Sequence, residues 1–126
     1  MSPESLDYLG TAERILREAE VFFEEGHNEV AAREAYLAAF SAARAVVFEK
    51  TGEAPKTHSG TRTALAKLMH EGLSLDQKFL NFLAQGFEQK VDTDYGARTP
   101  IEDSEAEAAL EIAHDLLATA RRILNR

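Results

Sequence analysis

The segment from Ala35 to Phe48 constrains the fold more than any other part of the chain, because a helix formed by it is apolar on every side. Its only exceptions are Ser41 and Arg44, and its six alanines allow neighbouring backbones to approach closely. A helix that is hydrophobic all round has to be covered, either by other helices of the chain or by a second subunit. The segment therefore predicts a central helix.

The rest of the chain also repeats apolar residues at helical spacing and hardly ever alternates them with polar ones, so no sheet is expected. Three prolines and seven glycines mark the connections. The pattern predicts helices over residues 3–26, 28–51, 61–70, 74–94 and 104–124. We expect an all-α, up-and-down helical bundle of four long helices plus one short helix, formed by residues 1–126 as a single domain.

Four of the predicted helices start at a residue suited to N-capping, because its side-chain oxygen can accept a free backbone N–H. These residues are Ser2, Asn28, Ser74 and Ser104. Ser74 and Ser104 are followed three residues later by Gln77 and Glu107, the spacing of a capping box. The caps support the predicted helix boundaries.

Composition excludes several classes of protein. The 126 residues include no cysteine, which removes disulfides, thiolate metal centres and a cysteine nucleophile, and fits a reducing compartment. No apolar run approaches the ~20 residues of a membrane span, and the first residues are acidic where a signal peptide is basic. We expect a soluble, cytoplasmic protein without a membrane segment.

The formal net charge of −8 is unevenly distributed along the chain. Residues 1–25 carry seven acidic and two basic residues, and residues 102–126 carry six and three. By contrast, residues 44–67 hold five basic and two acidic residues. The overall charge argues against a protein that binds nucleic acid non-specifically over its whole surface, but it leaves room for a local anion site.

Several kinds of catalytic site are poorly supported. The four histidines have no close metal-ligand spacing, so neither a metal nor another cofactor is expected. No glycine-rich loop is followed by Gly-Lys-Ser or Gly-Lys-Thr, which excludes a P-loop, and no DNA-binding motif is present. Ser59 beside His58 is explained more simply as a helix cap and its neighbour than as part of a catalytic triad.

Candidate ligand-binding residues lie on the central helix and in the loop after it. Arg44 must either reach the surface or meet an acid, or else form with Ser41, one turn away, the inner wall of a polar site. In the following segment, Lys56, His58 and Ser59 stand at the start of a short helix, whose free N–H groups favour an anion. Simple helix capping is the alternative interpretation of this segment.

Three sequence elements together resemble a known family. They are Ala-Ala-Arg-Ala at 42–45, Lys-Thr-His-Ser-Gly at 56–60 and Asp-Tyr-Gly at 94–96. In this order and spacing the chain resembles the HEPN family (higher eukaryotes and prokaryotes nucleotide-binding), specifically its small single-domain prokaryotic members. The resemblance implies a helical bundle and a homodimer, often encoded with a nucleotidyltransferase partner in a toxin–antitoxin arrangement.

The resemblance also implies a catalytic motif. Active members of the family are metal-independent ribonucleases whose motif is an arginine followed after four to six residues by a histidine. The corresponding positions here are Lys90 and Tyr95, with Asp94 as a neighbouring ligand-binding candidate. Lys90 can supply a cation, but the tyrosine has an ordinary pKa near ~10 and is a poor base at neutral pH.

Three hypotheses follow. The first is a dimer that binds a nucleotide, an RNA or a nucleotidyltransferase-type antitoxin partner, with weak or no catalysis. The second is a metal-independent ribonuclease toxin that uses Lys90 and Tyr95. The third is a helical protein that only assembles with another one through its alanine-rich helix.

Overall fold

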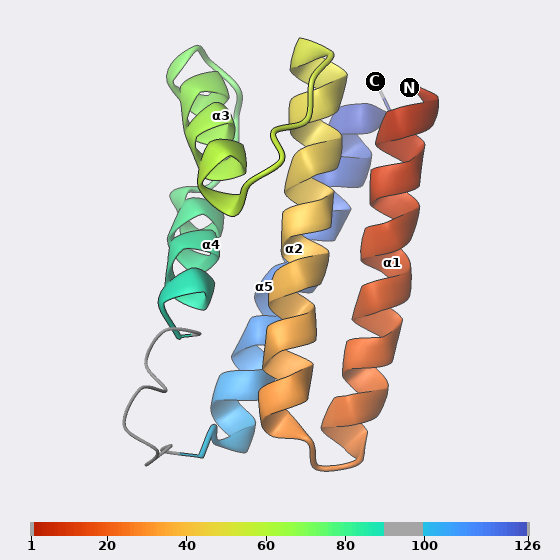
Figure 1. Cartoon of the computed structure of the whole chain (residues 1–126), viewed down its shortest axis with the longest axis vertical. Helices are drawn as coiled ribbons and strands as arrows, with labels where there is room; N and C mark the ends of the chain where they lie inside the picture. Colours follow the sequence, from red (N-terminus) through yellow and green to blue (C-terminus); the bar gives the residue numbers. More distant parts are fainter. Residues whose placement is uncertain (1, 90–99, 126) are drawn as a thin grey trace.

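The computed structural model describes residues 2–89 and 100–125, which form five α-helices and no strand (Figure 1). The helices are α1 (Pro3–Glu24), α2 (Asn28–Thr51), α3 (His58–His70), α4 (Gln77–Gln89) and α5 (Asp103–Leu124). The prediction of an all-α helical bundle is confirmed. The predicted site residues Lys90, Asp94 and Tyr95 lie outside the described residues.

The helix α2 is the centre of the bundle, as the sequence predicts. It packs against each of the four other helices, whereas α1 contacts α2 and α5 but neither α3 nor the described part of α4. In Figure 1, α1 and the pair formed by α3 and α4 lie on opposite sides of α2. The long helices α1, α2 and α5 form the main core, and the shorter helices α3 and α4 flank it.

The apolar surface of α2 is buried within a single chain. Thirteen of its residues are buried, among them the six alanines between positions 35 and 45. Small side chains at these positions let the backbones of neighbouring helices approach, and α1 shares the most extensive contact with α2. The helices of the same chain therefore supply the cover that α2 needs, and its apolar surface gives no argument for a second subunit.

Two predicted helix starts differ in their outcome. Ser2 caps α1 as predicted, because its hydroxyl accepts the backbone N–H of Ser5 at 3.2 Å. The prediction for Asn28 is wrong, since the N-cap of α2 is His27. The side-chain amide of Asn28 instead donates to Oδ1 of Asp103 at 2.6 Å and to the backbone carbonyl of Ile101 at 3.1 Å. These two hydrogen bonds connect the start of α2 to the start of α5.

The two predicted capping boxes are also wrong, by two residues each. The helix α5 starts with a box made by Glu102 and Glu105, so an acid takes the place expected for Ser104. The helix α4 begins only at Gln77, and Oδ1 of Asp76 accepts the N–H of Lys78 at 2.9 Å. In each case a carboxylate is the capping acceptor, and its negative charge also suits a helix N-terminus.

The helix α3 begins at His58, three residues before the predicted start at Thr61. Thr57 is its N-cap, and Oγ1 of Thr57 accepts the N–H of Gly60 at 2.9 Å. A Cβ atom at position 60 would lie only 2.8 Å from that Oγ1 and 3.0 Å from Cβ of Pro55, which explains the glycine. The first turn of α3 is thus packed tightly against the loop before it.

The connection from α2 to α3 determines which residues of α2 the first turn of α3 contacts. Gly52 ends α2 with a positive φ of 78°, a conformation that glycine adopts easily. The chain then runs back along α2, so α3 starts beside the middle of α2 rather than beyond its end (Figure 1). This path carries the loop and the first turn of α3 over the residues around position 40.

No helix of the described residues has the length and apolar character required to cross a membrane.

Candidate functional site

One stripe of α2 faces α3 and contains Tyr36, Phe40 and Arg44. These residues are spaced by four, so their side chains follow one another along the same side of the helix. The two aromatic residues are each 2 % exposed, and Arg44 is partly exposed. The stripe is apolar and buried at Tyr36 and Phe40, and it ends at the partly exposed cation Arg44.

The imidazole ring of His58, in the first turn of α3, lies on this stripe. It stacks on the ring of Phe40 with a centroid distance of 4.1 Å and an angle of 21° between the planes. Tyr36 meets His58 edge-on at 5.8 Å and Phe40 edge-on at 4.9 Å. From α4, Phe82 approaches Tyr36 edge-on at 6.1 Å. Four rings from three helices thus form one cluster, which we call the α2–α3 ring cluster.

Arg62 stands one turn after His58 on α3 and affects the phenol of Tyr36. Burial raises the pKa of Tyr36 to about 12, because a buried phenolate loses its hydration, and the positive charge of Arg62 opposes this rise. Arg62 is therefore close enough to the ring cluster to act on it electrostatically. The tyrosine remains a neutral phenol at physiological pH.

Arg44 is the unusual cation of this region. One of its terminal nitrogens, Nη2, donates to the backbone carbonyl of Lys56 at 3.3 Å, while Nε is buried with no hydrogen-bond partner among the described residues. None of the ion pairs between described residues involves Arg44. The sequence predicts that Arg44 either reaches the surface or meets an acid. No such salt bridge is found in the described part of the chain. A buried donor without an acceptor costs about 1–3 kcal/mol.

The other predicted ligand residues are distributed unevenly. The buried hydroxyl of Ser41 is directed toward α1, because it donates to the backbone carbonyl of Tyr8 at 2.7 Å. Lys56 has an exposed side chain and meets Arg44 through its backbone carbonyl, and the exposed hydroxyl of Ser59 lies 3.5 Å from that of Thr57. The structure therefore brings Arg44, Lys56, His58 and Ser59 to the place where the first turn of α3 meets α2, whereas the hydroxyl of Ser41 is used in a contact with α1.

Sequence reasoning missed Tyr36, Phe40 and Arg62 as members of the site. The two aromatic residues looked like ordinary core residues, and Arg62 was counted among the basic residues of positions 44–67 without being assigned to the site. A signal was present in the spacing, since Tyr36, Phe40 and Arg44 follow one another by four, as do His58 and Arg62. The spacing does not predict the path of the loop, which brings these residues of α2 and α3 together.

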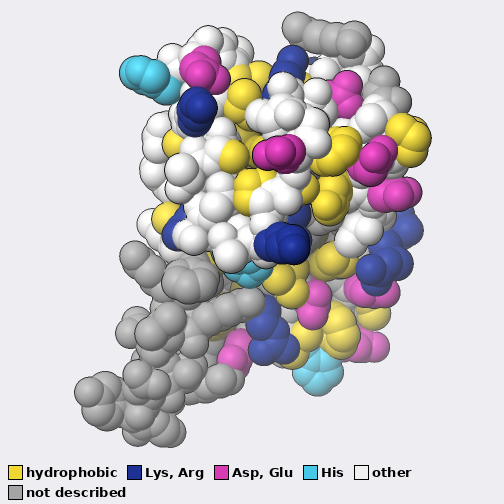
Figure 2. Space-filling model, turned by 45° about the horizontal axis from the view of Figure 1, so that its top comes forward, with side chains coloured by type: hydrophobic (Ala, Val, Ile, Leu, Met, Phe, Trp, Pro, Cys, Tyr) yellow, Lys and Arg dark blue, Asp and Glu magenta, His cyan; other side chains and the backbone are white. Residues whose placement is uncertain are grey.

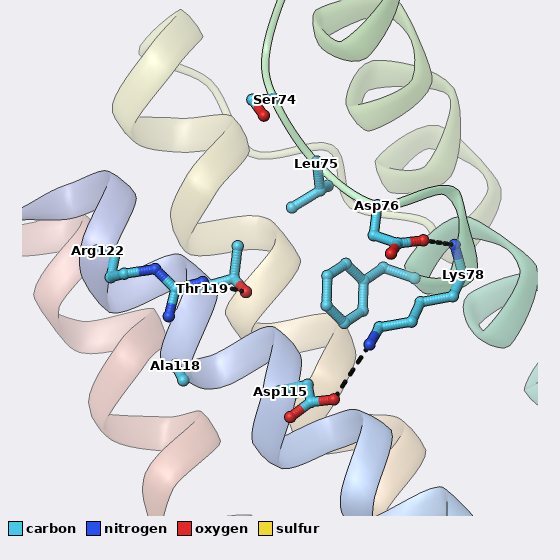
Figure 3. A pocket seen from close by; sticks show the side chains of 9 residues that line it. Ser74, Leu75, Asp76, Lys78, Asp115, Ala118, Thr119 and Arg122 are labelled. Atoms are coloured by element: carbon cyan, nitrogen blue, oxygen red, sulfur yellow. Dashed lines mark hydrogen bonds and ion pairs between the residues drawn. The ribbon is translucent and has the colours of Figure 1, made fainter.

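A hollow lies between the start of α4 and the C-terminal half of α5 (Figure 3), away from the ring cluster. Its volume is about 440 Å³, and its lining combines Leu75, Phe79 and Ala118 with polar side chains of both charges. Lys78 reaches across to Asp115 at 3.2 Å, and Nη2 of Arg122 donates to the hydroxyl of Thr119 at 3.1 Å. Lys78 and Arg122 thus have an ion-pair or hydrogen-bond partner in this hollow, whereas Nε of Arg44 has no hydrogen-bond partner among the described residues.

The surface is mixed in charge, and acidic, basic and hydrophobic side chains alternate over the face seen in Figure 2. Within residues 2–89 and 100–125, no group of three or more His, Cys, Asp or Glu side chains is placed to hold a metal ion. Much of the acidity belongs to α1, where Glu20 meets His114 at 3.0 Å and Glu13 pairs with Arg121. The cations around α3 are therefore a local feature.

Comparison with known protein families identifies the family of the chain. The family model described as HEPN domain covers residues 5–123, which is nearly the whole chain. A search among curated proteins finds no match. The family indicates a function related to nucleotides or RNA.

Proposed function

The chain belongs to the HEPN family, and on this premise we propose that it is a dimeric protein that binds a nucleotide or RNA, with weak or no catalysis. The ligand site of this proposal lies where the first turns of α3 meet α2, and it consists of Arg44, Lys56, His58, Ser59 and Arg62. A nucleotidyltransferase-type partner in a toxin–antitoxin system is the setting that the family resemblance suggests.

The observation that carries the proposal is the state of Arg44. A guanidinium presents five N–H donors in a planar fork, which matches the oxygens of a phosphate. Here this fork has one bond to a backbone carbonyl, and its Nε has no acceptor among the described residues. A phosphate group would provide the negative charge that Arg44 lacks among the described residues and further acceptors for its terminal nitrogens.

The surroundings of Arg44 support an anion as well. Residues 44–67 carry five basic and two acidic residues in a chain whose net charge is −8. The first turn of α3 adds backbone N–H groups at the positive end of a helix of 13 residues. Acidic helices elsewhere in the bundle would repel nucleic acid from other faces and so favour this one.

Binding is tested with the purified protein by fluorescence anisotropy on a labelled single-stranded RNA and by calorimetry with ribonucleotides. We expect Arg44→Gln to weaken binding by about tenfold or more, since a charge-assisted hydrogen bond contributes roughly 1.5–3 kcal/mol. Arg17→Gln is the matched control, because Arg17 is an exposed arginine on α1, which does not contact α3. Equal affinities of the two variants would disprove the site, and absence of any binding by the wild type would disprove the function.

The dimer is tested separately by analytical ultracentrifugation at micromolar concentration. Because α2 is covered within one chain, its alanines are not available as an interface, and the assembly hypothesis loses its original motive. We expect a dimer that forms through other surfaces. A monomer over the whole concentration range would contradict this part of the proposal.

Ribonuclease activity is the second candidate function, and the sequence spacing of Lys90 and Tyr95 favours it. It predicts metal-independent cleavage of RNA that falls when Lys90→Ala or Tyr95→Phe is introduced. Growth arrest or RNA cleavage that is unchanged in both variants would show that these two residues are not the catalytic groups.

A further inference from the structure

We propose that the hollow between the start of α4 and the C-terminal half of α5 binds a small zwitterion, of the class of a free amino acid or a short peptide. The carboxylate of this ligand lies against Arg122 and its ammonium group against Asp76. We call this hollow, whose lining residues fall within positions 74–79 and 115–122, the α4–α5 hollow. It shares no lining residue with the site assigned to Arg44, so the two sites can be tested separately.

The first argument is the shape of the α4–α5 hollow. Its volume of about 440 Å³ falls within the ~300–1,000 Å³ that is typical of small-molecule sites. Asp115, Ala118, Thr119 and Arg122 line it from one face of α5, and residues before and at the start of α4 form the facing wall (Figure 3). Two helical turns separate Asp115 from Arg122, so the α5 wall is about 10 Å long. The hollow therefore has room for a ligand whose two ends are several bonds apart.

The second argument is the charge balance of the lining. Two acids and two cations line the hollow, namely Asp76, Asp115, Lys78 and Arg122. Lys78 and Asp115 neutralise each other, since Nζ lies 3.2 Å from Oδ2. No ion pair between described residues involves Asp76 or Arg122. One negative and one positive group thus lack a partner there, and a zwitterion matches both, whereas a simple anion or cation matches one and is repelled by the other.

The third argument is the hydrogen-bonding capacity of these two groups. Nη2 of Arg122 donates to the hydroxyl of Thr119 at 3.1 Å, which holds the guanidinium over the α5 wall. Its other N–H groups donate to no described residue, and such a planar fork suits a carboxylate. Oδ1 of Asp76 accepts the N–H of Lys78 at 2.9 Å, while its other oxygen accepts no hydrogen bond from the described residues. Each group is oriented by one hydrogen bond and can form more.

The fourth argument is the apolar part of the lining. Phe79 belongs to the core with 3 % exposure, and Leu75 and Ala118 beside the hollow are partly exposed. An apolar ligand side chain would remove the exposed surface of Leu75 and Ala118 from water. The hollow therefore favours amino acids or peptides with an aliphatic side chain over fully polar ones.

The experiment titrates the isotope-labelled protein with free leucine and with the dipeptide alanyl-leucine, and follows the backbone amide signals by NMR. We expect signals of residues 74–79 and 115–122 to shift and to saturate. Saturation by leucine identifies a site for a free amino acid, and saturation by the dipeptide alone identifies a peptide site; either result supports the proposal. The N-acetylated and the C-amidated form of the ligand should each bind about fivefold more weakly, the upper end for an exposed ion pair.

Two variants assign the ends of the ligand. Arg122→Gln should weaken binding by about fivefold and remove the preference for a free carboxylate over the amide. Asp76→Asn keeps an oxygen that can cap α4, and it should remove the preference for a free ammonium group over the acetylated form. Arg121→Gln is the matched control, because Arg121 is the neighbouring exposed arginine, pairs with Glu13 and does not line the hollow.

A third variant tests the hollow itself. Ala118→Leu fills it without changing any charge and should abolish the shifts, whereas Ala108→Leu, at an exposed position of the same helix, should leave them unchanged. Thermal unfolding of each variant, followed by circular dichroism, verifies that it is folded. If Ala118→Leu does not fold, the loss of ligand preference in Arg122→Gln and Asp76→Asn decides the question.

Two results would overturn the proposal. One is the absence of shifts in residues 74–79 and 115–122 with both ligands at millimolar concentration. The other is equal binding of the free, acetylated and amidated ligands. Neither result affects the proposed function, because RNA binding depends on Arg44 and should be unchanged in Arg122→Gln.

Discussion

The two sides of α2 are built differently. Toward α1 and α5 the contacts are extensive and aliphatic, and five residues of α1 and seven of α5 are buried. Toward α3 the contact adds aromatic rings and the cation Arg44 to aliphatic side chains, and α3 buries only Thr61 and Leu65. The comparison indicates that the α1–α5 side provides most of the stability, while the α3 side is free to carry a ligand site.

The two sides of α2 also differ in how their charged groups are paired. On the α1–α5 side, charged groups meet across the helices, as in the pair of Glu13 and Arg121. On the α3 side, Arg44 has no ion pair among the described residues and its Nε has no acceptor. A protein can leave a cation in this state where the stability lost is small and a ligand provides the partner.

Truncating the α1 core should have the largest effect on stability. Leu16 is 2 % exposed, so Leu16→Ala should lower the free energy of unfolding by about 2–5 kcal/mol, from lost burial and a residual cavity. Leu68→Ala on α3 removes the same group from a partly buried position and should cost clearly less. Urea denaturation of both variants measures the difference, and equal losses would break the division of the molecule into two sides.

Removing helix caps on the two sides should separate stability from binding. Ser2→Ala and Thr57→Ala each remove a hydroxyl that accepts an N–H of the first helical turn, so each should cost about 1 kcal/mol. Only Thr57→Ala loosens the first turn of α3, and only this variant should also weaken RNA binding. Thermal unfolding and fluorescence anisotropy test the two effects; weaker binding in Ser2→Ala would argue against a local site.

The phenol of Tyr36 should make the α3 side sensitive to alkaline pH. Its pKa is about 12 in the folded chain and about 10 when unfolded, so the unfolded state releases its proton first as the pH rises. Stability should therefore fall above about pH 10, by roughly 1 kcal/mol between about pH 9 and about pH 11. Urea denaturation at both pH values should show a smaller fall in Tyr36→Phe, and an identical fall in both proteins would contradict the assignment.

The surface ion pairs of the α1–α5 side should have the smallest effect. Arg121→Gln removes the partner of Glu13, and both side chains are substantially exposed, so the loss should be below about 1 kcal/mol and smaller in high salt. RNA affinity should stay unchanged, in contrast to Arg44→Gln. A large loss of affinity would mean that the ligand reaches across to α5.

Most of the fold could be predicted because it depends on local patterns. The all-apolar segment from Ala35 to Phe48 had to be central, and the glycine at position 52 had to end its helix. Helix starts were less predictable, since any nearby oxygen can cap a helix. At α5 the carboxylate of Glu102 took the place expected for Ser104, and at α2 the side chain of Asn28 bound the start of another helix instead.

The sequence by itself determined that the chain is a helical bundle with α2 at its centre, because helical periodicity and burial are properties of each segment. It also placed a local excess of basic residues at positions 44–67 and an excess of acidic residues at both ends of the chain. Only the tertiary structure decided which of these groups meet. The loop after Gly52 turns back along α2, and that path puts His58 on Phe40 and the carbonyl of Lys56 on Arg44, while Ser41 turns to α1. Contacts between segments depend on the course of the connections, which no local pattern of residues encodes.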